Sequence, residues 1–423
     1  MKYLTDKKIN ISIIGLGYVG LPLSIEFAKK NNVCGFDIDK VRIENLIKAK
    51  DTTLEVSSKL LKNSNIKFTS NSNDLKNTDI FIITIPTPVD SKKIPDLSML
   101  KNATKTVAKN LKNKSIVVFE STVYPGCTEE ICIPILEKYS KLKLNKNFSV
   151  GYSPERINPG DKLRSIRDIS KVVSASNKNA LEVLIRLYSQ IIDKEVHAAS
   201  SIKVAEASKI IENTQRDLNI GLMNELLTIF DKMNISNKEV LEAANTKWNF
   251  LDFKPGLVGG HCIGVDPYYL TYKSKKIGIK PNLISAARKI NDSLHKFIAK
   301  KISKICIKHK LKKNILILGY AFKENCPDFR NTRVYHLINY LHKLGYKVKI
   351  HDPYINLNKK SFPFTSSSID FHNDKIKHDI IFLAVPHNFY INRYKKIKRL
   401  LTSRGVIFDY KAKLNKSSKV IQF

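Results

Sequence analysis

The feature that most constrains the fold is a glycine-rich segment near the N-terminus, where Gly15, Gly17 and Gly20 lie between two regular patterns. Residues 9–16 form an apolar, β-branched run and residues 21–30 have helical spacing, so the glycines occupy a strand-to-helix turn. The first glycine permits a tight turn, the second lets a ligand approach the backbone, and the third lets helix and strand pack closely. The pattern favours a dinucleotide site at a helix N-terminus, with a glycine turn in an unrelated α/β protein as the alternative.

Asp37 supplies the second half of this pattern, because it ends the next apolar strand seventeen residues after Gly20. A carboxylate at this place accepts hydrogen bonds from ribose hydroxyls and repels a 2′-phosphate, which favours NAD over NADP. Arg42 lies five residues further on, where its charge would offset part of that repulsion. The candidate cofactor positions in this region are Gly15, Gly17, Tyr18, Val19, Gly20, Asp37 and Arg42.

Three regions with different patterns follow one another along the chain. Residues 80–85 and 115–120 repeat the strand pattern, which predicts βαβ units and a parallel sheet. Residues 201–247 show no strand pattern and predict a long helical segment, with further helices around residues 284–305. Strand and helix patterns then alternate again, and the basic tail after Tyr410 is expected to fray. The predicted boundaries are 1–198, 199–305 and 306–423.

The net charge is the second unusual feature. Lys and Arg total 73 against 38 Asp and Glu, a formal charge of +35, while apolar residues make up 43% of the chain. The apolar share excludes wholesale disorder. A charge of this size is typical of proteins that bind nucleic acid, an anionic membrane or acidic ligands, but a Lys-rich background composition explains it equally well.

The ends and the cysteines indicate the compartment. The first ten residues contain no apolar leader segment, and no apolar run reaches the roughly 18 residues of a membrane-spanning helix. The six cysteines form no CxxC pair and no zinc spacing with histidine. We therefore expect a reduced, cytoplasmic protein with no membrane partner and no metal site.

Cys262 differs from the other cysteines in its neighbours. It follows His261, lies among the glycines Gly259, Gly260 and Gly264, and precedes Asp266 by four residues. A reactive thiol needs access to a ligand and groups that move protons, whereas the alternative is a small buried side chain in a tight loop. His261 either tunes the thiol, bonds the backbone or contacts substrate, and the sequence leaves this open.

A helical polar cluster is the other candidate for chemistry. Glu206, Lys209 and Asn213 have the i, i+3, i+7 spacing of one helix face. Lys209 and Asn213 would hold an oxyanion between a charge and an amide N–H, and the alternative is a solvated polar face. Residues 120–122 and 153–156 are further candidate loops, because parallel sheets place ligand groups at their strand ends.

Seven ordered motifs closely resemble those of the UDP-glucose/GDP-mannose dehydrogenase family nearly from end to end. They are GLGYVGLPL with FDIDKVR, IPTPVD followed by PDLS, ESTVYPG, GYSPERINPG, EASKIIENTQRDLNIGLMNEL, PGLVGGHCIGVDPYYL and GYAFKENCPDFRNTRV. The resemblance implies two Rossmann-like doubly wound α/β domains, one binding NAD and one binding UDP, joined by a helical domain with a long helix that forms a homodimer. It also implies that two NAD molecules oxidise a UDP-sugar C6 alcohol to a carboxylate.

The family's catalytic roles are carried over by motif position. Cys262 matches the nucleophile, which would trap the intermediate aldehyde as a thiohemiacetal and then form a thioester. Lys209 and Asn213 match the groups that stabilise the oxyanion. Asp266 matches a carboxylate that works with the lysine and a water, and Glu155 matches a base for thioester hydrolysis. The implied catalytic residues are Cys262, Lys209, Asn213, Asp266, Glu155 and Thr122.

The resemblance also implies binding residues. Thr122 would orient water beside the nicotinamide, Thr87 would contact the cofactor, and Arg330 would approach its phosphates. Lys323 matches a UDP-sugar contact, and Phe253 with the glycines after it matches a loop over the sugar nucleotide. Cys326 has no catalytic counterpart. The implied substrate-binding residues are Glu155, Arg156, Lys209, Asn213, Phe253, Gly259 and Lys323.

Two departures from the family pattern indicate the sugar. UDP-glucose enzymes generally read GGxCxPKD, whereas this chain reads GGHCIGVDP, and Pro159 stands where they carry an acidic residue. Both departures resemble the branch that acts on UDP-N-acetylglucosamine or UDP-N-acetylgalactosamine for capsule and O-antigen synthesis, with the UDP-N-acetylmannosamine enzymes slightly further away. A UDP-glucose 6-dehydrogenase is the alternative. A nucleic-acid-binding protein is disfavoured, because the chain shows none of the familiar nucleic-acid motifs.

Overall fold

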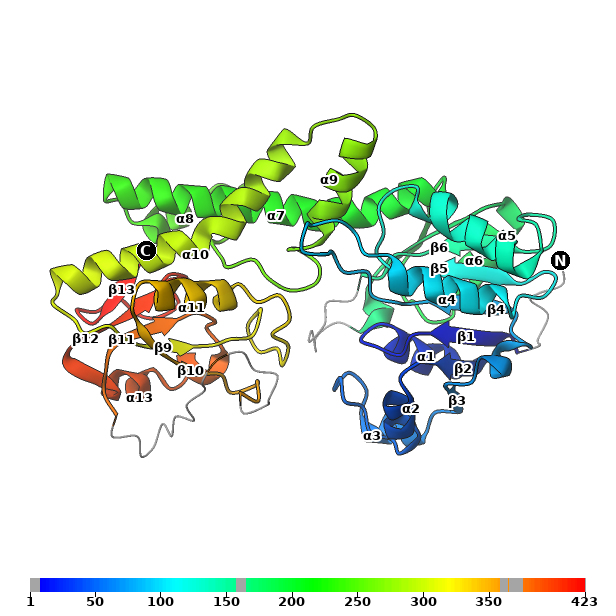
Figure 1. The fold of residues 1–423 in the computed structure, drawn as a ribbon, viewed down its shortest axis with the longest axis horizontal. Helices are drawn as coiled ribbons and strands as arrows, with labels where there is room; N and C mark the ends of the chain where they lie inside the picture. The colour runs from blue at the N-terminus through cyan, green and yellow to red at the C-terminus, as the bar shows by residue number, and fades with distance from the viewer. Residues whose placement is uncertain (1–7, 157–164, 358–363, 365–375, 423) are drawn as a thin grey trace. The chain divides into compact units, whose positions relative to one another are not determined.

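The computed structural model describes residues 8–156, 165–357, 364 and 376–422. Contacts divide the chain into two compact units, Met1–Glu212 with Tyr268–Ile279 and Asn213–Pro267 with Lys280–Phe423. Figure 1 shows that each unit is built around its own β-sheet. The predicted domain boundaries concern sequence segments rather than contacts, and they stay a prediction.

The first unit contains an eight-stranded sheet in the order β3-β2-β1-β4-β5-β6-β7-β8. Its strands are β1 (Asn10–Ile14), β2 (Asn32–Phe36), β3 (Ile66–Thr69), β4 (Ile80–Ile83), β5 (Ile116–Phe119), β6 (Ser149–Tyr152), β7 (Lys171–Ala175) and β8 (Val196–Ala198). All neighbours are parallel except β6 and β7, which are antiparallel. β1 lies between β2 and β4, so the strand order reverses there, which is where ligands bind in sheets of this type.

Helices cover both faces of this sheet because strand side chains alternate in direction. Ile13, Ile82 and Val118 belong to a buried cluster with residues of α1, α2 and α6. Their neighbours Ile14 and Ile83 are also fully buried, which requires a second covered face. The helices are α1 (Gly20–Ala28), α2 (Lys40–Ile47), α3 (Ser58–Lys62), α4 (Ser98–Ala108), α5 (Ile133–Ser140) and α6 (Lys178–Tyr188), with short turns at Ser72–Leu75, Thr128–Cys132 and Ile166–Asp168.

The second unit contains a five-stranded parallel sheet in the order β10-β9-β11-β12-β13. Ile317 and Phe382 pack with α10 and α11 on one face, and Leu316 and Ile381 pack with α13 on the other. The strands are β9 (Asn314–Leu318), β10 (Lys347–His351), β11 (His378–Leu383), β12 (Leu401–Asp409) and β13 (Val420–Gln422). The helices are α8 (Asn237–Ala244), α10 (Asn282–Lys308), α11 (Val334–Lys343), α12 (Asn388–Ile391) and α13 (Tyr394–Arg399).

Two helices contribute residues to both units: α7 (Ile202–Met233), with 32 residues, and α9 (Asp266–Lys276). The predicted order of α/β, helical and α/β regions is confirmed, including the long central helix. The strands predicted to form a parallel sheet, β1, β2, β4 and β5, are parallel to one another, and the antiparallel strand β7 lies beyond the segments that the prediction covered. One expectation is wrong: the tail does not fray, because β13 pairs with β12. None of the helices among the described residues combines the length and apolarity needed to cross a bilayer.

Candidate active site

In the glycine turn after β1, two of the three glycines lie against other atoms of the protein and one faces open space. Gly15 has φ +95°, and a Cβ there would lie 2.8 Å from Ile85 Cδ1. A Cβ on Gly20 would lie 1.9 Å from the Gly15 carbonyl oxygen, whereas one on Gly17 would meet no atom within 4 Å. Gly15 and Gly20 therefore serve the protein's own packing, and Gly17 leaves exposed backbone that a pyrophosphate can approach. Tyr18 and Val19, both half-buried, complete the turn.

Asp37 and Arg42 both fasten this turn. The half-buried Asp37 accepts hydrogen bonds from Leu16 N at 2.9 Å and Asp39 N at 3.0 Å. The sequence suggests that Arg42 faces the cofactor, but its buried guanidinium donates to the Leu16 carbonyl at 2.8 and 3.0 Å and pairs with Asp51 at 2.7 Å. Asp51 thus compensates the Arg42 charge, which leaves the carboxylate of Asp37 to repel a 2′-phosphate.

Three further candidates lie at the same edge of the sheet, because they follow the parallel strands β4, β5 and β6. Thr87 Oγ1 donates to the carbonyl of Thr122 at 2.5 Å, and Tyr269 OH donates to the carbonyl of Thr87. Glu155 stands three residues after β6 and is buried. This edge therefore carries the glycine turn, Thr87, Thr122 and Glu155 together, as the sequence predicts.

Glu155 belongs to a buried charge cluster that sequence reasoning missed. Lys171 Nζ lies 3.0 Å from Glu155 Oε2 and 2.8 Å from Glu120 Oε2, and Tyr188 OH donates to Glu120. Burial raises the pKa of Glu120, which Lys171 opposes. Burial lowers the pKa of Lys171, but the two carboxylates raise it above its ordinary value. Lys171 is thus held as a cation, and no sequence spacing connects it with either glutamate.

Arg156 has a partner of its own in the same unit. Its Nη2 lies 2.7 Å from Glu212 Oε1 of α7, and its Nη1 donates to the Ser170 carbonyl at 3.0 Å. The adjacent Pro159, on which the sugar assignment partly depends, lies outside the described residues.

The polar cluster on α7 is buried, which excludes a solvated face. Glu206, Lys209 and Asn213 are 0%, 8% and 5% exposed. Glu206 accepts hydrogen bonds from Gly126 N at 2.5 Å and Thr128 N at 2.9 Å, so it holds the loop after β5. Burial raises the pKa of Glu206 to about 7. Lys209 Nζ makes no hydrogen bond or ion pair with any residue that the structure describes, which is unusual for a buried cation.

In the second unit, Asp266 contacts both Asn213 and the backbone of Cys262. Asn213 Nδ2 donates to Asp266 Oδ2 at 2.6 Å, and Asp266 N donates to the Cys262 carbonyl at 2.8 Å. Cys262 is half-buried, whereas Cys127, Cys132, Cys306 and Cys326 are buried.

Cys34 is the other half-buried cysteine, and burial raises the pKa of its thiol to about 11. Its thiolate is therefore scarce at neutral pH. These differences leave Cys262 as the candidate nucleophile.

The glycines beside Cys262 are also needed for packing within the protein. A Cβ on Gly259 would lie 2.7 Å from the Asn331 carbonyl oxygen, and Gly260, with φ +80°, would place one 2.7 Å from the Phe322 ring. Glycine is therefore required for this loop to pack against the segment after β9. Before this loop, Gly256 exchanges two hydrogen bonds with Asn224, and the ring of Phe253 is half-buried.

His261 and Arg330 share one carboxylate. His261 Nε2 lies 3.2 Å from Asp328 Oδ2, and Arg330 Nη2 lies 2.7 Å from the same oxygen. Burial raises the pKa of Asp328, but the hydrogen bonds from His261 and Arg330 lower it well below its usual range. The contact of His261 that the structure shows is with Asp328, which no sequence pattern predicts. Lys323, nearby in sequence, lies with its Nζ 5.7 Å from the Phe322 ring centroid.

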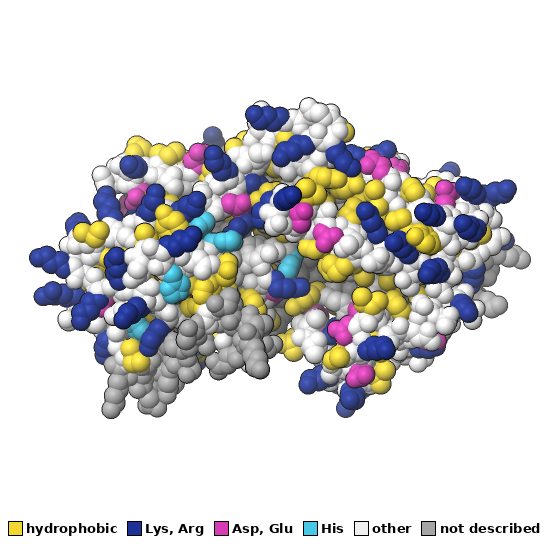
Figure 2. All heavy atoms as spheres, in the orientation of Figure 1, with side chains coloured by type: hydrophobic (Ala, Val, Ile, Leu, Met, Phe, Trp, Pro, Cys, Tyr) yellow, Lys and Arg dark blue, Asp and Glu magenta, His cyan; other side chains and the backbone are white. Residues whose placement is uncertain are grey.

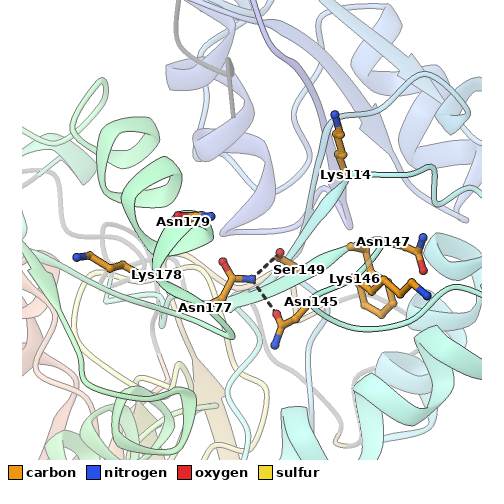
Figure 3. A pocket seen from close by; sticks show the side chains of 9 residues that line it. Lys114, Asn145, Lys146, Asn147, Ser149, Asn177, Lys178 and Asn179 are labelled. Atoms are coloured by element: carbon orange, nitrogen blue, oxygen red, sulfur yellow. Dashed lines mark hydrogen bonds between the residues drawn. The ribbon is translucent and has the colours of Figure 1, made fainter.

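A hollow of about 350 Å³ in the first unit lies away from these groups. Its lining comes from the starts of β5, β6 and α6, and Asn177 bonds Asn145 at 2.8 Å and Ser149 at 2.9 Å (Figure 3). The starts of β5 and β6 form the opposite edge from Thr122 and Glu155, so this hollow is not the candidate active site. The described residues contain no group of three His, Cys, Asp or Glu side chains placed to hold a metal ion.

Comparison with known families covers most of the chain. The NAD-binding, central and UDP-binding domains of the UDP-glucose/GDP-mannose dehydrogenase family match residues 9–192, 203–293 and 316–416. The chain belongs to this family. The match assigns the glycine turn after β1 to the NAD-binding domain and Lys323 and Arg330 to the UDP-binding domain.

Individual relatives cover nearly the whole length. Protein CapL of Staphylococcus aureus is 51% identical over 409 residues, 96% of each chain. A UDP-N-acetyl-D-glucosamine 6-dehydrogenase of Pseudomonas aeruginosa is 46% identical over 410 residues, 96% of this chain and 97% of that one. Among solved structures, a UDP-D-ManNAc dehydrogenase from Pyrococcus horikoshii matches with a TM-score of 0.88 at 28% identity, over 98% of both chains.

Proposed function

We propose that this protein oxidises the C6 alcohol of UDP-N-acetylglucosamine or UDP-N-acetylgalactosamine to the carboxylate with NAD, for surface polysaccharide synthesis as capsule or O-antigen. The observation that carries the chemistry is the half-buried Cys262 beside Asp266, which in turn holds the Asn213 amide at 2.6 Å. The substrate assignment is supported by the GGHCIGVDP segment and by the 46% identity to a UDP-N-acetyl-D-glucosamine 6-dehydrogenase.

The residues around the glycine turn fit NAD, since Gly17 is open to a pyrophosphate and Asp37 is accessible to ribose hydroxyls. Bound NAD accepts a hydride, once in each of the two oxidations. The proposed cofactor contacts are Gly15, Gly17, Tyr18, Val19, Gly20, Asp37, Thr87, Thr122 and Arg330. We propose that Arg42 acts indirectly, by holding Leu16 and thereby the turn.

Cys262 has the central role in the proposed mechanism. After the first oxidation its thiolate adds to the aldehyde carbon, which forms a C–S bond and a thiohemiacetal alkoxide. Lys209 and Asn213 stabilise that oxyanion by charge and by an amide N–H. Loss of the second hydride from the same carbon gives a thioester. Water then attacks the thioester carbon and the C–S bond breaks, which regenerates the Cys262 thiolate and releases the carboxylate product. Glu155 takes one proton of the attacking water, and the second proton is released to solvent.

The remaining polar groups position the reactants. Asp266 orients Asn213 through their hydrogen bond, and Thr122 orients water near the nicotinamide. Arg156, Phe253, Gly259 and Lys323 contact the UDP-sugar. The charge of Arg156 is shared with Glu212, so its contribution to phosphate binding is smaller than that of an unpaired cation.

We also propose that the protein is a cytoplasmic homodimer joined through α7. This helix exposes five apolar side chains, each 44–58% accessible: Val204, Ile211, Leu222, Ile229 and Met233. At 3.6 residues per turn, their spacing places all five in a strip about 40° wide along one face. A second copy of α7 would cover the same strip on both helices.

The positive charge does not require a nucleic-acid partner. Figure 2 shows Lys and Arg side chains spread across the visible face rather than gathered in one patch. We propose that nucleic acid is not a partner, and that the domain boundaries lie at 1–198, 199–305 and 306–423.

A substrate panel tests the function. Purified protein is given NAD with UDP-N-acetylglucosamine, UDP-N-acetylgalactosamine, UDP-N-acetylmannosamine or UDP-glucose, and NADH is measured per sugar consumed. We expect turnover of one or both of the first two, with two NADH per sugar because the full reaction removes four electrons. Turnover of UDP-glucose alone would contradict the substrate proposal, and one NADH per sugar would contradict the double oxidation.

A further inference from the structure

We propose that Lys171 is a positioning residue for the reaction, which holds Glu155 ionised and correctly directed from the neighbouring antiparallel strand. The inference rests on the proposed role of Glu155 as the base in thioester hydrolysis. Lys171 itself is not proposed to touch the substrate.

The direction of β7 brings Lys171 to the catalytic edge of the sheet. The β6–β7 pairing aligns Gly151 with Ala175 and Tyr152 with Ser174. Continued by three residues, the same antiparallel register places Glu155 opposite Lys171, the first residue of β7. A parallel β7 would begin at the other edge of the sheet, so the one antiparallel pair in this sheet is what allows the contact.

The contact is buried and charged on both sides. The side chains of Lys171, Glu120 and Glu155 are 3%, 0% and 10% exposed, with Lys171 Nζ within 3.0 Å of both carboxylates. A buried ion pair seldom adds stability over well-packed apolar residues. The presence of the pair is better explained by its effect on Glu155, whose carboxylate also accepts the Arg156 N–H at 2.6 Å.

Glu120, Tyr188 and Arg156 are further charged or titratable groups near Lys171 and Glu155. Glu120, directly after β5, competes with Glu155 for the same cation. Tyr188 of α6 donates its OH to Glu120, and its ring centroid lies 5.4 Å from Lys171 Nζ. Arg156 turns its guanidinium to Glu212 on α7 rather than to this cluster. Lys171 is therefore the cation that favours the ionised form of Glu155, and Glu120 is the anion that opposes it.

Lys171→Met is the main test, read as the pH profile of kcat. Without the cation Glu155 takes up a proton at higher pH, so the acid limb of kcat moves upward. On that limb a displacement of one pH unit lowers kcat about tenfold at a given pH. Because hydrolysis is the step affected, intact-protein mass should show acyl-enzyme on Cys262 at neutral pH that disappears at alkaline pH. Lys171→Arg should restore most of the wild-type profile.

Glu120→Gln gives a shift of opposite sign and keeps the test valid if Lys171→Met does not fold. Removing the competing anion leaves Lys171 to Glu155 alone, so the acid limb should move to lower pH. The control is Lys112→Met, which breaks a more exposed pair with Asp79 at 2.8 Å, ahead of β4 and β5 on the other edge of the same sheet. Its acid limb should stay in place.

Glu155→Gln distinguishes a wrong role for Glu155 from a wrong role for Lys171. If Glu155→Gln has wild-type kcat at every pH, the assigned role of Glu155 is wrong. If Glu155→Gln is slow but Lys171→Met and Glu120→Gln change only thermal stability, with the acid limb unmoved, then Lys171 is merely structural and the present inference is overturned.

Discussion

Two glycine turns, one in each unit, have nearly the same local structure. Gly15 follows β1 with φ +95°, and Gly319 follows β9 with φ +94°. The N–H of each glycine donates at 2.8 Å to a carbonyl of the adjacent strand. The next residue in each turn donates to an aspartate that ends or follows that strand: Leu16 N to Asp37 and Tyr320 N to Asp352.

The two aspartates differ in what else they bind. Asp37 is half-buried and accepts two backbone N–H groups. Asp352 has a fully buried side chain and accepts from Tyr320, Ala321 and Tyr354 backbone N–H groups and from His387 Nε2. Since His387 Nδ1 accepts the Asn325 N–H at 2.8 Å, its proton is on Nε2, which donates to Asp352.

The two turns share one backbone geometry but differ in whether the carboxylate is open to a ligand. The same backbone geometry leaves one carboxylate open to ligand hydroxyls and fills the other with the chain's own donors. The positions equivalent to Gly17 and Gly20 are Ala321 and Glu324, so the second turn also lacks the open backbone. We infer that only the first turn serves as a dinucleotide site.

The largest expected effect is that of Gly20→Ala. The new Cβ would lie 1.9 Å from the Gly15 carbonyl oxygen, so the turn must move. Overpacking of this kind costs about 1–3 kcal/mol of stability or more, and we expect NAD binding to be lost in calorimetry. Gly17→Ala, in open space, is the control: it should keep the melting temperature and weaken NAD binding only. Unchanged NAD affinity in both variants would show that the first turn is not the cofactor site.

Asp352→Asn should destabilise the second unit without affecting the cofactor. The amide nitrogen would face N–H donors, and a buried donor left without its acceptor costs about 1–3 kcal/mol of unfolding free energy. Urea unfolding would measure the loss, and NAD affinity below the transition should be unchanged. A large fall in NAD affinity in the folded variant would erase the distinction between the two turns.

Asp37→Asn should weaken cofactor binding rather than stability, and its expected effect is smaller than that of Asp352→Asn. Loss of the carboxylate weakens its bonds to ribose hydroxyls, so KM for NAD should rise about tenfold, equivalent to about 1.4 kcal/mol. Preference for NAD over NADP should fall as well, because the repulsion of a 2′-phosphate is removed. The measurement is kcat/KM with each cofactor, and an unchanged ratio would remove Asp37 from cofactor selection.

The smallest expected effect is on acid stability. Burial raises the pKa of Asp352, but His387 and the backbone N–H groups lower it below its ordinary value. A depressed carboxyl pKa contributes stability that is present above the unfolded value of about 3.9 and is lost as pH falls through the folded pKa. Urea unfolding at pH 5, 4 and 3 should therefore show a steeper loss in the wild type than in Asp352→Asn. Equal slopes would mean that Asp352 carries no such stabilisation.

Much of the candidate site was accessible from spacing alone. The glycine turn, the strand-end threonines and the Cys262–Asp266 segment are local patterns, and strand ends of a parallel sheet converge on one edge. The contacts of single side chains were not accessible. Arg42 suggests a phosphate ligand from its position after Asp37, but Asp51 and the Leu16 carbonyl bind it instead. Asp328 and Lys171 gave no sequence signal.

The sequence by itself determined the strand–turn–helix units, the two α/β regions with a helical middle and the likeness to one enzyme family, and it singled out Cys262 as the candidate nucleophile. These depend on hydrophobic periodicity and on short segments, which are local along the chain. Only the tertiary structure decided which turn stays open, which charges are compensated and which cation faces Glu155. Those outcomes depend on strand direction and burial, because an antiparallel β7 and a buried His387 bring together groups that lie far apart in sequence.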